Sequence, residues 1–232
     1  MNPLPWSRPL PPGSVAVAYT GGVQLGAHVM ARLAPYERER VLRGCSTNVD
    51  NLDAGHWGTL LSSALVVEEP MPLPYALLLV AALGYAEYAY GAWWTAAAFL
   101  FGHACATLLV HTVLRRTADT ETRRALDVGT SYGLNTVLGV LTSALPRGTV
   151  RGVARVGLLA LAAAPVFKRG RTFTDVGHLV ALGVGVGLSL AVDRLSGAGP
   201  RGSVRTRAVT RPAPSCRPHS TRPIRTALEP PR

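Results

Sequence analysis

The sequence predicts an all-α integral membrane protein with six transmembrane helices, and three observations carry this prediction. Hydrophobic residues make up 48% of the 232 residues and charged residues only 16%, whereas an ordinary soluble domain has about 25% charged residues. Between Pro70 and Leu114 the only carboxylate is Glu87, and lysine and arginine do not occur. Apolar segments close to the length that crosses a bilayer core, about 20 residues, recur along the chain.

This composition excludes a disordered chain, a secreted disulfide scaffold and a water-soluble enzyme. The cysteines, Cys45, Cys105 and Cys216, are odd in number and far apart, which fits neither a disulfide framework nor a metal site. We therefore expect a protein that needs no metal and no cofactor. A multi-pass protein of the cell membrane is the predicted class.

Six segments fit the length of a span, and we expect one membrane domain over 14–193 behind an N-terminal tail at 1–13. The first segment is a weak candidate for a span because the polar residues Gln24 and His28 interrupt it. We interpret it as a retained helix and not as a signal peptide. A polar connection, 34–69, separates it from the second, and its part 56–67 is predicted to lie in the interface. The second and third segments form a hairpin with Glu87 in the turn. The expected spans are 14–32, 74–86, 92–113, 125–145, 153–167 and 173–192.

The chain ends in an Arg- and Pro-rich segment, 194–232, which we expect to be disordered and cytoplasmic. It contributes to a formal net charge of +11 and favours contact with an anionic membrane leaflet. Nucleic-acid binding is disfavoured because this segment has no aromatic residue to stack on bases. The arginines elsewhere are spread over both sides of the expected spans and do not fix the orientation.

Polar residues inside apolar spans are the candidates for function, since each needs a partner there. The fourth and sixth spans run parallel, and Ser131 and His178 lie at similar depth near their starts. If small-residue faces bring these spans together, the hydroxyl and the imidazole meet as a nucleophile with its general base. The structural alternatives are a small packing residue at 131 and a buried histidine satisfied by a carbonyl. The expected faces are Ser131, Asn135, Gly139 and Thr142 on the fourth span, and His178, Ala181 and Gly185 on the sixth.

The segment around Ser131, from Gly129 to Gly133, also matches the G-x-S-x-G pattern of hydrolase nucleophile elbows. That motif requires a preceding strand, which the sequence before Gly129 does not supply. We therefore reject a soluble hydrolase fold.

With its glycine-flanked Ser131, its His178–Gly185 segment and its six expected spans, the chain resembles the rhomboid family of intramembrane serine proteases over about 34–192. The resemblance implies that Ser131 attacks a peptide bond of a transmembrane protein substrate and that His178 acts as base and later as acid. It also implies a cytoplasmic N-terminus and C-terminal tail. The lipid bilayer and a transmembrane substrate or client are the expected partners, and nucleic acid is not.

The sequence departs from the family pattern at two places. Tyr132 stands between Ser131 and Gly133, and the histidine and asparagine that support the oxyanion in rhomboids are missing from 72–79. We expect substitutes on the third span, where His103, Thr107 and His111 share one face, with backbone N–H groups near Gly129 and Tyr132 helping. Asp175 either orients the His178 ring or accepts from free N–H groups at a helix start.

These departures keep two alternatives open. A rhomboid-like pseudoprotease would retain the fold and bind transmembrane segments without cleaving them. A small transporter is disfavoured because the sequence has no inverted repeat and no pair of interrupted spans in corresponding positions.

Overall fold

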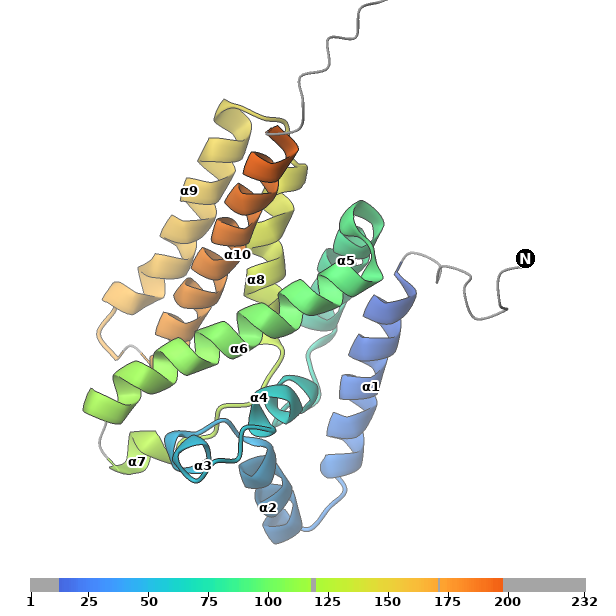
Figure 1. Cartoon of the computed structure of the whole chain (residues 1–232). Coiled ribbons are helices and arrows are strands. Elements are labelled where there is room, and N and C mark those ends of the chain that lie inside the picture. The colour runs from blue at the N-terminus through green and yellow to red at the C-terminus, as the bar shows by residue number, and fades with distance from the viewer. Residues whose placement is uncertain (1–12, 118–119, 171, 198–232) are drawn as a thin grey trace, which may run out of the picture. The chain divides into compact units, whose positions relative to one another are not determined.

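The structure is a computed structural model that describes residues 13–117, 120–170 and 172–197, and every regular element among them is helical. The tails expected at 1–13 and 194–232 lie almost entirely outside these residues. The longer helices are α1 (Ser14–Met30), α2 (Pro35–Cys45), α5 (Leu73–Tyr90), α6 (Ala92–Thr117), α8 (Ser131–Leu141), α9 (Thr149–Ala163) and α10 (Phe173–Gly197) (Figure 1). The shorter pieces are α3 (Val49–Asp53), α4 (Thr59–Ser62), η2 (Ser63–Leu65), α7 (Thr120–Arg123), η3 (Thr142–Ala144) and η4 (Ala164–Phe167).

Three helical segments of the described chain are long and apolar enough to cross a membrane, namely Ala92–Arg116, Thr149–Phe167 and Phe173–Arg194. They correspond to the predicted third, fifth and sixth spans, and they confirm the expectation of an all-helical membrane protein. The predicted count of six spans is not confirmed. In α5, Glu87 and four tyrosines lower the apolar character of the helix, and α1 has only 17 residues.

The fourth predicted span, 125–145, is helical over a much shorter length than expected. Helix α8 has 11 residues, or about 16 Å at 1.5 Å per residue, which is about half of a bilayer core of about 30 Å. The residues before it do not continue the helix, because Gly129 has φ +136° and its N–H donates to the carbonyl of Ser63. Helix α8 therefore begins at Ser131, six residues later than the predicted span.

The hairpin between α5 and α6 is tighter than predicted, because α5 stays helical through Tyr90 and only Gly91, with φ +88°, forms the turn. The expectation that Glu87 lies in this turn is wrong. Glu87 is a helical residue, 5% exposed, and its Oε2 accepts from the N–H of Gly13 at 2.9 Å. A carboxylate at the N-terminus of α1 satisfies one of the free N–H groups of that helix, which explains its burial.

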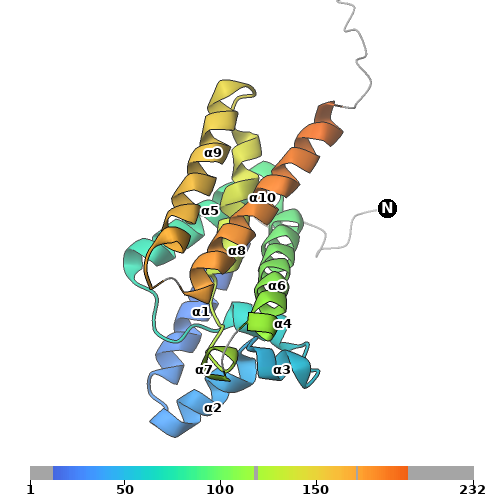
Figure 2. The same cartoon turned by 90° about the vertical axis from the view of Figure 1, so that its left-hand side faces the viewer.

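Helix α8 packs closely against both α6 and α10, which also contact each other (Figures 1 and 2). Glycines set these contacts: a Cβ at Gly185 would lie 2.0 Å from the carbonyl oxygen of Thr136, and one at Gly102 would meet the Thr136 side chain. The Thr136 hydroxyl donates to the carbonyl of Ala181 at 3.0 Å. This contact confirms the predicted close approach of the fourth and sixth spans.

Helix α9 packs mainly on α10 and leaves an apolar outer face, with Val153 64% and Leu161 71% exposed. At one end of this helix pair, Asp193 of α10 accepts from Arg155 at 2.6 Å and pairs with Arg151. Arg155 also donates to the hydroxyl of Ser189. These ion pairs satisfy charges in an apolar setting, as charged residues in membrane helices require.

Candidate functional site

The segment that leads into α8 is held by the connection between α1 and α5. The N–H of Thr47 donates to the carbonyl of Asp127 at 3.1 Å, and the N–H of Gly129 donates to the carbonyl of Ser63 at 2.9 Å. The hydroxyl of Ser46 accepts from the N–H of Asp127 at 2.9 Å. These bonds satisfy backbone groups that a continued helix would have paired internally, so the connection determines where α8 begins.

The side chain of Asp127 belongs to the same tether. Its Oδ2 accepts from the hydroxyl of Thr47 at 3.1 Å. Burial raises the pKa of the Asp127 carboxyl from 3.8 to about 6, and the Thr47 hydrogen bond opposes this rise. The carboxyl, in the segment that leads into α8, therefore titrates closer to neutral pH than an ordinary aspartate does.

Tyr132, the second residue of α8, occupies the centre of the site. Its side chain is 2% exposed and lies between histidines of two other helices. The ring centroid is 5.6 Å from that of His178 on α10 and 5.9 Å from that of His103 on α6. Gly177 makes room for it, since a Cβ there would lie 2.2 Å from the Tyr132 hydroxyl. The tyrosine therefore joins α6, α8 and α10 at one level.

Several buried polar atoms around Tyr132 have no hydrogen-bond partner among the described residues. They are the Tyr132 hydroxyl, Nε2 of His178 and Nδ1 of His103. Leaving one such group unpaired costs about 1–3 kcal/mol, so native proteins pair these groups with ordered water or use them in function. This clustering identifies the space around Tyr132 as the polar centre of the bundle.

His103 has one ring nitrogen engaged. Its Nε2 lies 2.9 Å from the hydroxyl of Ser63, and both residues are buried. Ser63 was not among the predicted site residues, because it lies 40 residues before His103 in a connection expected at the interface. The structure therefore contains a serine–histidine hydrogen bond, but between a different pair from the one predicted.

Ser131 is half-buried at the first position of α8. Its carbonyl accepts from the side-chain amide of Asn135 at 2.9 Å. Among the described residues, no hydrogen bond joins the Ser131 hydroxyl to His178. The neighbouring Tyr132 contacts the His178 ring, so Ser131 and His178 lie at the same end of the α8–α10 pair, and their pairing in catalysis stays a prediction.

The face of α8 that meets α10 is displaced by about one residue from the predicted one. Gly139 belongs to it as expected, with a Cβ there 2.7 Å from the Leu182 carbonyl oxygen, and Thr142 contacts Ser189 at 3.0 Å. Tyr132 and Thr136 fill the positions predicted for Ser131 and Asn135.

The remaining candidates lie at the edges of the site. His111, two turns beyond His103 on α6, has its Nε2 3.7 Å from Asp53. Asp175 accepts from both the N–H and the hydroxyl of Thr172 at 2.8 and 2.9 Å, and no hydrogen bond joins it to His178 among the described residues. The second of the two roles considered for Asp175, binding donors at a helix start, is the one that its contacts support.

These features define a helical membrane protein with a buried polar centre where a short helix starts against two longer ones. A family model described as rhomboid-like protein matches residues 16–195. The chain belongs to the rhomboid-like protein family, which confirms the resemblance found in the sequence and points to an intramembrane protease or a pseudoprotease. No curated protein and no solved structure matches the chain.

Proposed function

We propose that this chain is an intramembrane serine protease of the cell membrane that cleaves transmembrane substrates with Ser131 as nucleophile and His178 as general base. The observation that carries the proposal is Nε2 of His178, a buried ring nitrogen without a protein partner beside the start of α8. A general base needs a free nitrogen within reach of the proton it removes, and catalytic hydrogen bonds are often long before substrate binds. The missing Ser131–His178 bond is compatible with this role.

In the proposed reaction, the Ser131 oxygen attacks the carbonyl carbon of the scissile peptide while its proton moves to His178 Nε2. The tetrahedral intermediate expels the amine, which takes that proton, and an acyl-enzyme remains. Water, deprotonated by His178, then attacks the acyl carbon and releases Ser131. Within the described part of the chain no side chain caps α8, so the N–H groups of its first turn, at Ser131, Tyr132 and Gly133, are suitable donors for the oxyanion.

His103 is the proposed support from α6. Its bond to Ser63 fixes the ring, and its Nδ1 has no protein partner. His111 is placed less favourably for this role, because it lies two turns further and faces Asp53. In this proposal α1, α5 and α8 complete a six-span domain over 14–193, with the 194–232 tail in the cytoplasm.

A second candidate, a pseudoprotease that binds transmembrane segments, is favoured by one observation. The ring of Tyr132 lies against His178, in the space where the hydroxyl of a nucleophile has to reach the base. If Tyr132 keeps this position when a transmembrane segment binds, the chain has a recognition site without a working dyad.

A fluorophosphonate probe on the purified chain in detergent micelles tests the two candidates. The protease requires labelling that maps to Ser131 and is lost in Ser131→Ala and His178→Ala. Ser63→Ala serves as the matched control, because Ser63 is hydrogen-bonded to His103 and is fully buried. If the folded wild-type chain is not labelled, the protease proposal is wrong. If labelling is lost only in Ser63→Ala, the nucleophile is Ser63 and the proposed Ser131–His178 dyad is wrong.

A further inference from the structure

Two tyrosine hydroxyls of α5 bind the residues at the two ends of α8. The hydroxyl of Tyr75, near the start of α5, lies 2.9 Å from the hydroxyl of Thr130, the residue before α8. The hydroxyl of Tyr90, at the other end of α5, lies 2.6 Å from that of Ser143, just after α8. The same kind of bond therefore joins the two helices twice, once beside Ser131 and once at the far end.

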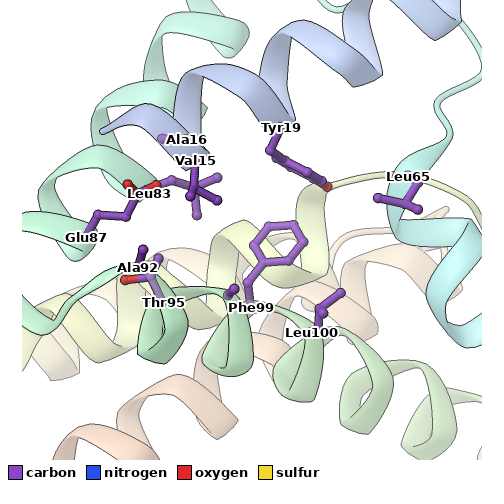
Figure 3. A pocket seen from close by; sticks show the side chains of 11 residues that line it. Val15, Ala16, Tyr19, Leu65, Leu83, Glu87, Ala92, Thr95, Phe99 and Leu100 are labelled. Carbon is purple, nitrogen blue, oxygen red and sulfur yellow. The ribbon is translucent and has the colours of Figure 1, made fainter. Parts of the chain in front are cut away.

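Between these two bonds, α5 borders an apolar cavity of about 130 Å³ that it shares with α1 and α6. Figure 3 shows Leu83 and Glu87 of α5 on the wall of this cavity. A helix that borders a cavity lacks partner atoms on that side, so the position of α5 depends on the bonds at its ends. Loss of the Tyr90 bond therefore measures the general effect of loosening α5, against which the effect of the Tyr75 bond is compared.

The bond to Tyr75 engages a hydroxyl that would ordinarily cap α8. Threonine before a helix usually adopts an extended conformation, and its side-chain oxygen then accepts from the N–H of the second or third helical residue. Thr130 instead has φ −89° and ψ −7°, and no side chain of the described chain caps the helix. Thr130 is 2% exposed and its hydroxyl is bonded to Tyr75. The conformation and the bond both keep this hydroxyl from the N–H groups of α8.

The first turn of α8 thereby keeps donors that a cap would occupy. The first backbone bond of the helix runs from the N–H of Leu134 to the carbonyl of Thr130 at 3.0 Å, so the N–H groups of Ser131, Tyr132 and Gly133 come before it. Gly133 is the third helical residue, the one whose N–H a threonine cap takes in a capping box. This N–H is therefore available to the oxyanion of the proposed reaction.

We infer that Tyr75 is a positioning residue that keeps α8 uncapped, an inference that rests on the proposed reaction at Ser131. Tyr75 acts through Thr130, whose hydroxyl it occupies, and not on the substrate. When Tyr75 loses its hydroxyl, Thr130 becomes an ordinary cap and pairs with the N–H of Gly133. The oxyanion then has to displace this cap, so the attack of Ser131 becomes slower.

Removing the same hydrogen bond from its two sides distinguishes this role from a structural one. In Tyr75→Phe the rate of fluorophosphonate labelling at Ser131 is expected to fall about fivefold, the ratio equivalent to a cap of about 1 kcal/mol. Thr130→Val loses the same bond but forms no cap, so it labels about fivefold faster than Tyr75→Phe. The double variant Tyr75→Phe/Thr130→Val recovers the faster rate for the same reason. Tyr90→Phe, the matched control on α5, labels at the wild-type rate.

Amide NMR detects the cap without any catalysis. The chain contains two Tyr–Gly peptide bonds, Tyr90–Gly91 and Tyr132–Gly133, so ¹³C-carbonyl tyrosine combined with ¹⁵N-glycine selects these two amide signals. The Gly133 signal is expected to move downfield in Tyr75→Phe, because its N–H gains an acceptor, and to keep its wild-type position in the double variant. Gly91, whose N–H is already bonded to a carbonyl of α5, is the internal reference.

Two results overturn the inference. One is a Gly133 signal that does not move in Tyr75→Phe. The other is labelling that slows in Thr130→Val or Tyr90→Phe as much as in Tyr75→Phe, because the bond would then be structural. If Gly133 moves as expected in a folded chain that the probe does not label, Tyr75 keeps α8 uncapped and the proposed reaction is wrong. The inference and the proposed function therefore fail separately.

Discussion

Replacing Gly185 by alanine tests the contact that determines which face of α8 meets α10. A Cβ at Gly185 would lie 2.0 Å from the carbonyl oxygen of Thr136 and 2.8 Å from its carbonyl carbon. Both atoms are backbone, so a rotamer change cannot relieve the clash and the helices have to separate. Overpacking of this kind costs about 1–3 kcal/mol, and the bond from Thr136 to the Ala181 carbonyl, worth about 1 kcal/mol, is strained with it.

The intrinsic helix preference works in the other direction, since alanine is favoured over glycine by about 1 kcal/mol in a helix. The net loss for Gly185→Ala is therefore about 1–3 kcal/mol. The control is Gly183→Ala on the same helix, where a Cβ would meet nothing within 4 Å, and here only the gain of about 1 kcal/mol applies. The two variants are expected to differ by about 2–4 kcal/mol, the sum of these opposite effects.

The assay is unfolding of each variant by sodium dodecyl sulfate in mixed micelles, followed by tryptophan fluorescence. Equal unfolding free energies for Gly185→Ala and Gly183→Ala would refute the close α8–α10 contact. The assignment of Tyr132 and Thr136 to that interface would fall with it.

Three further predictions concern the polar groups of the fold. Tyr132→Phe removes a buried hydroxyl without a protein partner and is expected to leave the thermal unfolding temperature unchanged or higher; a clear decrease would show that the hydroxyl is paired. Ionised Asp127 is disfavoured in the fold because its pKa is raised to about 6, so the stability of the wild type relative to Asp127→Asn should increase as pH falls from 7 towards 4, by at most about 3 kcal/mol. Unfolding titrations at pH 7 and pH 4 measure the difference in unfolding free energy between the wild type and Asp127→Asn. If this difference is the same at both pH values, the pKa of Asp127 is not raised. Asp193→Asn removes the carboxylate that pairs with Arg151 and Arg155 and should cost about 1.5–3 kcal/mol, the usual contribution of a charged hydrogen bond. The same sodium dodecyl sulfate unfolding measures it, and a loss below about 0.5 kcal/mol would mean that water or lipid replaces the pair.

The long helices were predictable because their determinants are local. Runs of apolar residues of membrane-crossing length define α6 and α10, and the expected starts at 92 and 173 agree with the observed ones. Gly91 ends α5 through its positive φ, a conformation that glycine adopts more readily than other residues. The extension of α5 through Glu87 was not predictable, because the partner of that carboxylate is Gly13, 74 residues away.

The candidate site was predictable in its residue types and not in its exact pairs. The sequence indicated that the starts of the fourth and sixth spans carry the polar groups, and the structure has Tyr132 and His178 in contact there. It did not indicate Ser63, since a serine in a polar connection has no pattern that distinguishes it. The pairing of His103 with Ser63 follows from tertiary packing of the connection against α6.

The connection between α1 and α5 decides the geometry at the start of α8, and this explains why the phase of that helix was predicted incorrectly. Had α8 begun near residue 125, the carbonyl of Asp127 and the N–H of Gly129 would have been paired within the helix. Instead the carbonyl accepts from Thr47 and the N–H donates to Ser63, and the helix starts at Ser131, where its own first N–H groups have no partner within the helix. The same tether therefore shortens α8, turns Tyr132 towards α10 and leaves the donors that the proposed reaction needs at Ser131.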